Sequence, residues 1–387
     1  MITVFRGEEM NVLIHKEITA INKILPNWSK LKEEFFEITI FQDIHWIKEW
    51  WNYKSSQRNV TPYILEIKDK DQTVGIIPLY IHNLKLSGIS FRILKPMGSE
   101  LSDYLIPILS RKYSVESVLS KAFEEIMKDK SNWDYLEWEN IPENSFFDDY
   151  LIQNLLGKYK TSKRIIGDSC SYIMLEKDVE KLISNLDEKL LKNIHYKERK
   201  LKKKGSFEFK KVSDEKQIEP IMNIFFELHC TRWNDTPTPS KFRFVEEREF
   251  LLQVAKNLFK SNLLHLTYLI QNDDVISVHF GMSDGNKLYG YLTAFDIRYR
   301  KFSVGVILDY HLLLLACKEG CEVFDFLRGD ESYKNQWGAF NNYNVRYILF
   351  NNSIRSETFR IIYKMTNSKF FSLYINQFIT NRLFKKA

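Results

Sequence analysis

The stretch FDFLRGDESYKNQWG, residues 324–338, joins an alternating apolar and polar segment to a polar, aromatic one. Alternation is typical of a strand, and it places Asp325 on the opposite face from its two phenylalanine neighbours. A carboxylate there could orient Lys334 or take a proton from an acceptor; it could equally accept a hydrogen bond from a backbone amide. A lysine in a polar turn is by itself most often solvated, and the triplet Arg328–Asp330 predicts only a turn.

Two further side chains have chemistry that suits a site. His279 shares a strand face with a small residue and a glycine, so a substrate could approach it there, and imidazole can deprotonate an amine near neutral pH. A structural histidine bonded to its neighbours is the alternative. Arg232 ends a predicted helix, where its guanidinium could bind an acceptor carboxylate or phosphate, or form a surface ion pair.

A basic segment could attract an anionic partner. Eight lysines and arginines lie between residues 189 and 204, in a chain whose formal net charge is only +6. A nucleotide, a phosphopantetheine carrier or an RNA would suit this charge. Leucines and an isoleucine at helical spacing in the same segment also fit a solvated helix with one buried stripe.

Length and composition indicate a folded protein of two domains. The chain has 387 residues, 44% hydrophobic and 27% charged, with few glycines and prolines. We read no signal peptide at the N-terminus, and the apolar runs are too short for a membrane helix, so we expect a cytoplasmic protein without a membrane partner. Four cysteines without a CxxC pair indicate neither a disulfide framework nor a metal site.

The two halves of the chain repeat one pattern of elements. Each half shows strands joined by short turns, at 61–83 and at 263–295, and then a helix, at 115–128 and at 305–319. Each helix leads into an aromatic-rich strand that ends in a polar turn. We therefore predict two copies of one mixed α/β unit, with a seam near residues 160–169 and domains 1–164 and 165–387.

The order of these elements, and several stretches of sequence, resemble the GNAT acyltransferase superfamily. The chain is most similar to the CelD-like acetyltransferase branch, itself similar to the Fem peptidyltransferases. The stretches are FQDIHWIKEWW, GSELSDYLIPIL, LKNIHYKERKLKKKG, FFELHCTRW, AFDIRYRKFSVGVILDYHLL and FDFLRGDESYKNQWG. The resemblance implies an α/β (α+β) fold of two tandem GNAT-like mixed sheets flanked by helices. It also implies acyl transfer in a ternary complex without a metal.

The resemblance places the acyl donor at the start of the second repeated helix. GNAT enzymes usually hold the pyrophosphate of coenzyme A on a glycine-rich turn at a helix N-terminus. Here the matching residues are Arg300, Ser303, Val304 and Gly305, and the usual two glycines are reduced to one. This departure leaves acyl-CoA, an acyl carrier protein thioester and aminoacyl-tRNA open as donors. Ser303 could instead simply cap a core helix.

The same resemblance assigns the remaining roles. A lysine after the equivalent strand of Fem relatives is associated with stabilising the charge that develops in transfer, and Lys334 matches it. Asp103 and Tyr104 match a motif on the cleft side of the first half, where they could receive an amine or a sugar hydroxyl; a strand start with a buried tyrosine is the alternative. We also assign Arg232, Tyr333 and Trp46 to the acceptor side.

These observations favour an acyltransferase that acts on the amino group of a small metabolite, an amino sugar or a natural-product precursor. N-acyl transfer is preferred over O-acyl transfer. In this scheme Lys334 polarises the carbonyl and Asp325 or His279 assists deprotonation, so Lys334→Ala should lose turnover with little loss of stability. The alternatives are a Fem-type transfer from aminoacyl-tRNA and a non-catalytic protein that binds nucleic acid or a partner.

Overall fold

The computed structural model describes residues 10–25, 28–56, 59–86 and 88–366. Within these residues one mixed sheet of thirteen strands runs through the whole molecule. Its strands follow the order β1-β2-β3-β4-β6-β13-β7-β12-β11-β10-β9-β8, and β5 pairs with β3. The two halves of the chain therefore share a single sheet.

The first half supplies one end of this sheet and the helices around it. Its strands are β1 (Met10–His15), β2 (Val60–Asp69), β3 (Gln72–Leu86), β4 (Ile89–Pro96), β5 (Ile108–Leu109) and β6 (Tyr135–Pro142). Its helices are α1 (Thr19–Ile24), α2 (Trp28–Glu34), η1 (Ile40–Gln42), α3 (Ile44–Ser55), α4 (Val115–Lys128) and α5 (Phe146–Asn154).

The second half supplies the remaining strands of the sheet and the remaining helices. Its strands are β7 (Ser162–Met174), β8 (Phe207–Lys211), β9 (Leu264–Gln271), β10 (Asp274–Ser283), β11 (Lys287–Phe295), β12 (Val323–Arg328) and β13 (Phe340–Phe350). Its helices are α6 (Val179–Asn185), α7 (Glu188–Lys202), α8 (Glu215–Trp233), η2 (Lys241–Arg243), α9 (Val245–Lys260), η3 (Ile297–Phe302), α10 (Val304–Lys318), α11 (Ser332–Asn335) and α12 (Ile354–Thr366).

The predicted duplication is present in the topology. In the first half three antiparallel strands, β2, β3 and β4, are followed by α4 and then by β6, which pairs parallel to β4. In the second half β9, β10 and β11 are antiparallel, and α10 leads to β12, which pairs parallel to β11. A parallel pair needs a crossover connection, which the helix provides in both halves. The predicted class, a mixed α/β fold of two tandem repeats with flanking helices, is confirmed, and the mixed sheets of the two repeats are joined into one.

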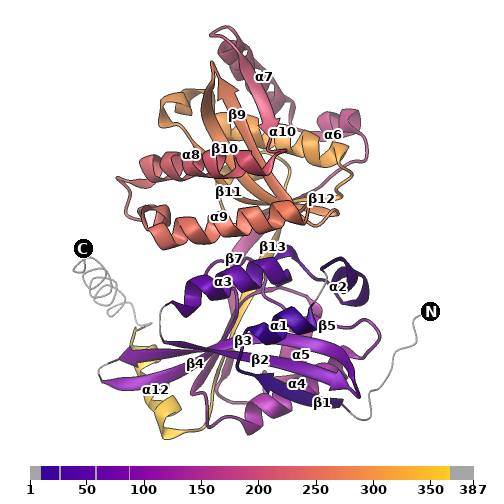
Figure 1. Ribbon diagram of the computed structural model, residues 1–387, viewed down its shortest axis with the longest axis vertical. Coiled ribbons are helices and arrows are strands. Elements are labelled where there is room, and N and C mark those ends of the chain that lie inside the picture. The colour runs from indigo at the N-terminus through magenta and orange to yellow at the C-terminus, as the bar shows by residue number, and fades with distance from the viewer. Residues whose placement is uncertain (1–9, 26–27, 57–58, 87, 367–387) are drawn as a thin grey trace.

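Two strands in the middle join the halves. β7 pairs with β12, while β13, the last strand described, lies between β7 and β6 and pairs antiparallel with both. Figure 1 shows these two strands crossing from one half to the other. The predicted division between residues 164 and 165 falls within β7.

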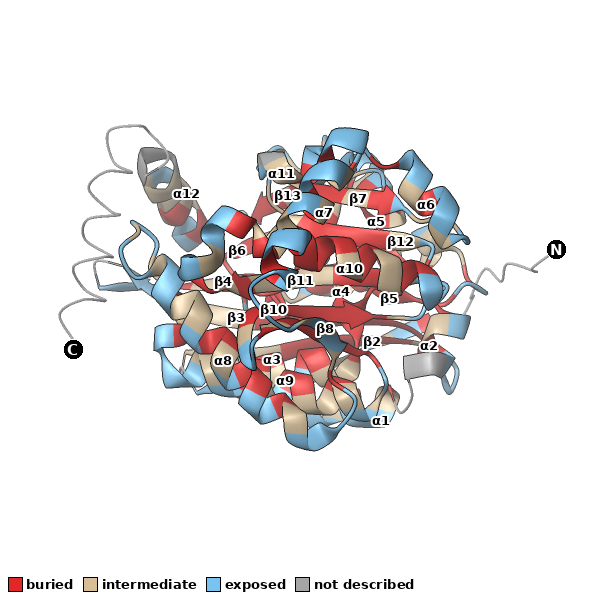
Figure 2. Cartoon of the chain, turned by 90° about the horizontal axis from the view of Figure 1, so that it is seen from above, coloured by how far each residue is buried: buried red, intermediate tan, exposed pale blue. Residues whose placement is uncertain are grey.

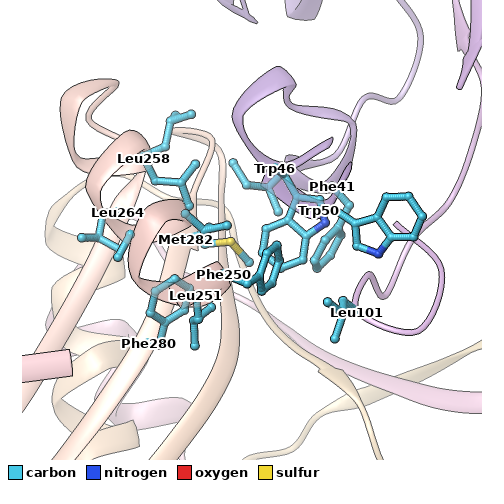
Figure 3. Close-up of a cluster of buried hydrophobic side chains, with 14 of the residues drawn as sticks. Phe41, Trp46, Trp50, Leu101, Phe250, Leu251, Leu258, Leu264, Phe280 and Met282 are labelled. Carbon is cyan, nitrogen blue, oxygen red and sulfur yellow. The ribbon is translucent and has the colours of Figure 1, made fainter. Parts of the chain in front are cut away.

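Helices cover both faces of the sheet. α3, α8 and α9 lie on one face, and α4, α5, α6, α7 and α10 lie on the other (Figure 2). On the first face a single apolar core crosses from one half to the other. There the ring of Trp46 from α3 meets the ring of Phe250 from α9, with their centroids 5.7 Å apart (Figure 3). The shared core fixes how the halves lie against each other.

Helix α10 is apolar on nearly every side because it is enclosed by the sheet, α6 and α7. Its fifteen residues nevertheless include Asp309, which is one of the buried ones. Among the described helices, none combines the length and the apolar character that crossing a membrane would require.

Candidate active site

The paired strands β11 and β12 part within the second half. Their parallel pairing runs from Lys287 opposite Val323 to Tyr289 opposite Asp325 and then ends. Just beyond, a bulge against β10 leaves Tyr291 without a paired residue. Bulges bend a strand and re-aim its side chains, and the Tyr291 hydroxyl reaches the first half, where it donates to the Leu101 carbonyl at 2.8 Å. The end of the pairing therefore lies at the junction of the two halves.

Asp325 sits at this end of the pairing and is held by both halves. Its side chain accepts one hydrogen bond from the Tyr104 hydroxyl at 2.8 Å and another from the Leu327 amide at 2.8 Å. Leu327 has a φ of 59°, a left-handed backbone that a leucine rarely adopts. Burial raises the pKa of Asp325 to about 6, although both hydrogen bonds favour its charged form. A carboxylate with such a pKa can accept a proton near neutral pH.

An ion pair beside Asp325 is a further contact between the two halves. The Arg328 guanidinium bonds the carboxylate of Asp103, and the backbone carbonyl of Asp103 accepts from the Asn344 amide at 2.8 Å. Burial disfavours the charged guanidinium, but Asp103 outweighs this and raises the pKa of Arg328. The prediction that the triplet Arg328–Asp330 is only a turn is therefore wrong for Arg328. Arg328 could not be recognised from its neighbours in the sequence, because its partner Asp103 lies in the other half.

A cavity of about 540 Å³ opens between the halves at Asp325. Residues of both halves line it, including Tyr104 and Glu37 from the first half and Tyr289 and Lys287 from the second. Its volume is within the range of small-molecule sites. The structure thus brings Asp325 and Tyr104 together at one cavity wall, with Asp103 directly behind them.

Lys334 is buried in α11, the short helix that follows β12 and its turn. Its ammonium group donates to the carbonyl oxygens of Leu327, Arg328 and Gly329 at 3.3, 3.2 and 3.1 Å, and it pairs with Glu331 at 2.9 Å. An ammonium has three hydrogens, so these four acceptors occupy all of them. Lys334 thus holds the turn that presents the Leu327 amide to Asp325.

The residues predicted to bind the donor lie at the start of α10. Ser303 has a φ of 51°, the left-handed conformation that a glycine would adopt without strain, and its side chain makes no capping hydrogen bond to the helix. Instead its hydroxyl accepts a hydrogen bond from Lys197 of α7 at 2.7 Å. Arg300 is exposed beside this turn, whereas Val304 is fully buried. The basic helix α7 therefore contributes a cation to the helix N-terminus where a donor phosphate would lie.

Asp309 was not among the predicted site residues. It lies four residues after Gly305 on the same face of α10, is buried, and forms no hydrogen bond or ion pair within the part of the chain described. Burial raises its pKa to about 7, and Lys334 offsets part of this effect. Burial and then Asp309 raise the pKa of Tyr333 well above its ordinary value. A charged residue inside an apolar run was the signal available in the sequence.

Among the residues predicted for catalysis or for the acceptor, Asp325 and Tyr104 line the cavity, whereas Asp103, Lys334, Tyr333, His279, Trp46 and Arg232 do not. His279 is buried beneath the sheet, where its Nδ1 atom meets Thr293 Oγ1 at 2.8 Å, and burial lowers its pKa to about 3. Trp46 is fully buried and donates to Ser102 Oγ at 2.8 Å. Arg232 lies on the donor side, 4.5 Å from the centre of the Phe295 ring. The geometry separates His279, Trp46 and Arg232 from Asp325 and Tyr104.

No group of three or more histidine, cysteine, aspartate or glutamate side chains within the described residues could hold a metal ion. The site is instead built from a parting parallel strand pair, a helix N-terminus and a cavity between two duplicated halves. This combination, with the duplicated topology, is that of a tandem GNAT-like fold.

Comparison with known proteins agrees with this class. Residues 188–335 match the family model described as an acetyltransferase (GNAT) domain. Among solved structures the chain is similar to FemX, with a TM-score of 0.58 and 12% identity over 88% of this chain and 97% of that one. The predicted tandem, Fem-like GNAT fold is confirmed.

Two other solved structures share the fold. One is a conserved protein of unknown function from Bacteroides thetaiotaomicron VPI-5482, with a TM-score of 0.57 and 10% identity over 88% of this chain and all of that chain, 100%. The other is L-PGS from Bacillus licheniformis, with a TM-score of 0.52 and 10% identity over 85% of this chain and 94% of that chain. No curated protein matches the sequence.

Proposed function

We propose that the protein transfers an acyl group from a thioester donor, held at the start of α10, to an amine that enters through the cavity between the halves. The donor is acyl-CoA or an acyl carrier protein, and the acceptor is a small amino-bearing metabolite or amino sugar. We place the reaction in the cytoplasm, where such thioesters are made.

One observation carries this proposal: the pairing of β11 and β12 ends at Asp325, and the cavity opens at the same residue. A donor lying along the parted strands from α10 would bring its thioester carbon to this point. An amine in the cavity would meet the same point from the other side. Holding both reactants in contact supplies much of the rate enhancement in a bimolecular transfer.

The residues around Asp325 suit the proton transfers of such a reaction. The amine nitrogen bonds to the thioester carbon, and Asp325 accepts the proton that the nitrogen loses. The carbon–sulfur bond then breaks, and the proton taken up by Asp325 passes to the leaving sulfur, which departs as a thiol and leaves the carboxylate ready for the next turnover. Tyr104 and the Leu327 amide orient the Asp325 carboxylate, and Lys334 fixes the turn that carries Leu327.

A Fem-type transfer from aminoacyl-tRNA is the second candidate. The observation that favours it is Lys197, which extends the basic surface of α7 to the donor turn at Ser303. Binding of tRNA to such a surface should weaken steeply with salt, because phosphate contacts release counterions. A filter-binding titration with total tRNA at two salt concentrations distinguishes the two donors.

The test measures donor binding and transfer with acetyl-CoA and longer acyl-CoA thioesters, by thermal shift and by thiol release in the presence of amine acceptors. We expect stabilisation by at least one donor and amine-dependent thiol release. Asp325→Asn should abolish release, while Asp330→Asn, in the exposed turn nearby, should not. The proposal fails if neither a thioester nor charged tRNA binds the protein or supports transfer.

A further inference from the structure

The cavity between the halves is lined by two cationic side chains, Lys287 and Arg111, that binding an amine does not require. We propose that the acceptor carries an anionic group, a carboxylate or a phosphate, in addition to its amine, and that Lys287 and Arg111 bind this group. The inference rests on the proposed function, since it treats the cavity as the acceptor site.

Lys287 is a cation without a carboxylate partner. It lines the cavity from β11, and within the described residues no carboxylate lies within ion-pair distance of its ammonium group. It precedes Tyr289 by two residues on the same strand face, about 7 Å along the strand from the Tyr289–Asp325 pair. Its charge therefore faces the cavity at a distance from the reacting end.

Arg111 is a second cation that lines this cavity. Among the residues that the structure describes, its guanidinium donates to backbone carbonyls only, to Phe35 at 2.8 Å and to Lys32 at 3.4 Å. Lys32, which also lines the cavity, is in contrast paired with Asp284 at 3.3 Å. Since backbone carbonyls do not neutralise a guanidinium, Arg111 keeps a net positive charge toward the cavity.

The carboxylates at this end compensate these cations only in part. Asp284 is already engaged by Lys32 and accepts from the Tyr289 hydroxyl at 3.1 Å. Burial raises the pKa of Glu37, and Lys287 offsets part of the rise without forming an ion pair with it. The two cations, Lys287 and Arg111, thus face one carboxylate, that of Glu37, whose charged form is disfavoured. This arrangement favours binding of an anionic group of a ligand.

The other end of the cavity suits an amine. Asn344 is buried, and its amide nitrogen donates to the Asp103 carbonyl at 2.8 Å, which leaves its Oδ1 atom as the acceptor. Within the described part of the chain this oxygen has no hydrogen-bond partner. A buried acceptor without a partner is costly unless a ligand or water fills the place, and the ammonium or amine of an acceptor would do so. Asn344 lies beside Tyr104 and Asp325 in the cavity wall.

The cavity therefore has two poles, an acceptor-rich pole at Asp325 and Asn344 and a cationic pole at Lys287 and Arg111. A ligand that satisfies both has an amine and, several bonds away, a carboxylate or a phosphate. A neutral amine of the same size would fill the first pole and leave the second uncompensated.

The experiment compares matched acceptor pairs that differ in the anion: glucosamine 6-phosphate with glucosamine, and L-lysine with 1,5-diaminopentane. Binding is measured by calorimetry and transfer by steady-state kinetics. We expect at least about tenfold tighter binding and lower KM for the anionic member of one pair, and the responding pair tells phosphate from carboxylate.

Lys287→Gln should remove this preference by raising KM for the anionic acceptor about tenfold while KM for its neutral counterpart stays the same, because the ion pair with the anion is lost. Lys85→Gln, on an exposed position of β3, is the matched control and should change neither value. Equal affinity for both members of each pair, or an equal effect of Lys287→Gln on both, overturns the inference while leaving transfer itself intact. Absence of transfer with every donor would instead overturn the proposed function, and calorimetry would still report the anion preference.

Discussion

Replacing Asp325 by asparagine is expected to abolish acyl transfer and, at pH 8, to make the protein more stable. Asparagine keeps the shape of the side chain and can still accept from the Leu327 amide, while its NH₂ group can donate to the Tyr104 hydroxyl. What it removes is the charge. A general base of this kind contributes roughly a hundredfold or more to turnover, so the variant should be essentially inactive.

The size of the stability gain follows from the pKa. Burial raises the pKa of Asp325 from 3.8 to about 6 in the folded protein, a difference of about 2 units. Each unit corresponds to about 1.4 kcal/mol, so ionised Asp325 opposes folding by up to about 3 kcal/mol. Because the folded pKa is the higher one, this penalty is complete above pH 6 and fades as the pH falls from about 6 to about 4. We expect Asp325→Asn to gain about 1 to 3 kcal/mol at pH 8.

The measurement is urea unfolding of the wild type and the variant at pH 8 and at pH 4.5, with Asp330→Asn as the control for a loss of charge in an exposed turn. The groups that act on the Asp325 charge, Lys287 and Asp103, are the same in both proteins. The reasoning is refuted if Asp325→Asn is less stable than the wild type at pH 8, or if the difference does not shrink at pH 4.5.

Three further variants test the remaining parts of the site. Arg328→Leu should lower the free energy of unfolding by about 2 kcal/mol in urea titrations, since it leaves Asp103 buried without its cation, and pairing it with Asp103→Leu should restore most of this; no recovery would mean that the pair is not coupled. Lys334→Met should lower both turnover and stability, the latter by about 2 kcal/mol, because three backbone carbonyls lose their donor; full stability in a melting curve would contradict the buried geometry. Lys197→Ala should raise KM for the donor several-fold with kcat unchanged, an effect that shrinks at high salt, and no change at low salt would remove Lys197 from the donor site.

The predicted elements were those with strong local signals. The apolar run of α10, the alternation around Asp325 and the turn residues of the hairpins can be recognised within a short window of sequence. The repeat of one pattern in both halves then predicted the tandem fold. Such signals say where a strand begins and ends, but they do not say which strands lie side by side.

The contacts of the site depend on tertiary structure, which cannot be recognised within a short stretch of sequence. Tyr104 and Asp325 are separated by 221 positions, and Asp103 and Arg328 by 225. Arg328 therefore looked like part of a turn. Lys334 looked solvated or free to project, because its burial depends on carbonyls turned toward it by the left-handed backbone at Leu327. The predicted small effect of Lys334→Ala on stability does not fit this burial.

Because β13 is a central strand that comes late in the chain, the sheet cannot be completed until most of the protein has been synthesised. Residues 340–350 are made long after residues 135–142, yet they must insert between β6 and β7 in the middle of the sheet. Until then the first half of a nascent chain presents an open edge at β6, which invites pairing with other chains. Pairings at such long sequence separation also form slowly. The protein is therefore expected to fold late and as one unit, and to depend on protection of that edge while the second half is being made.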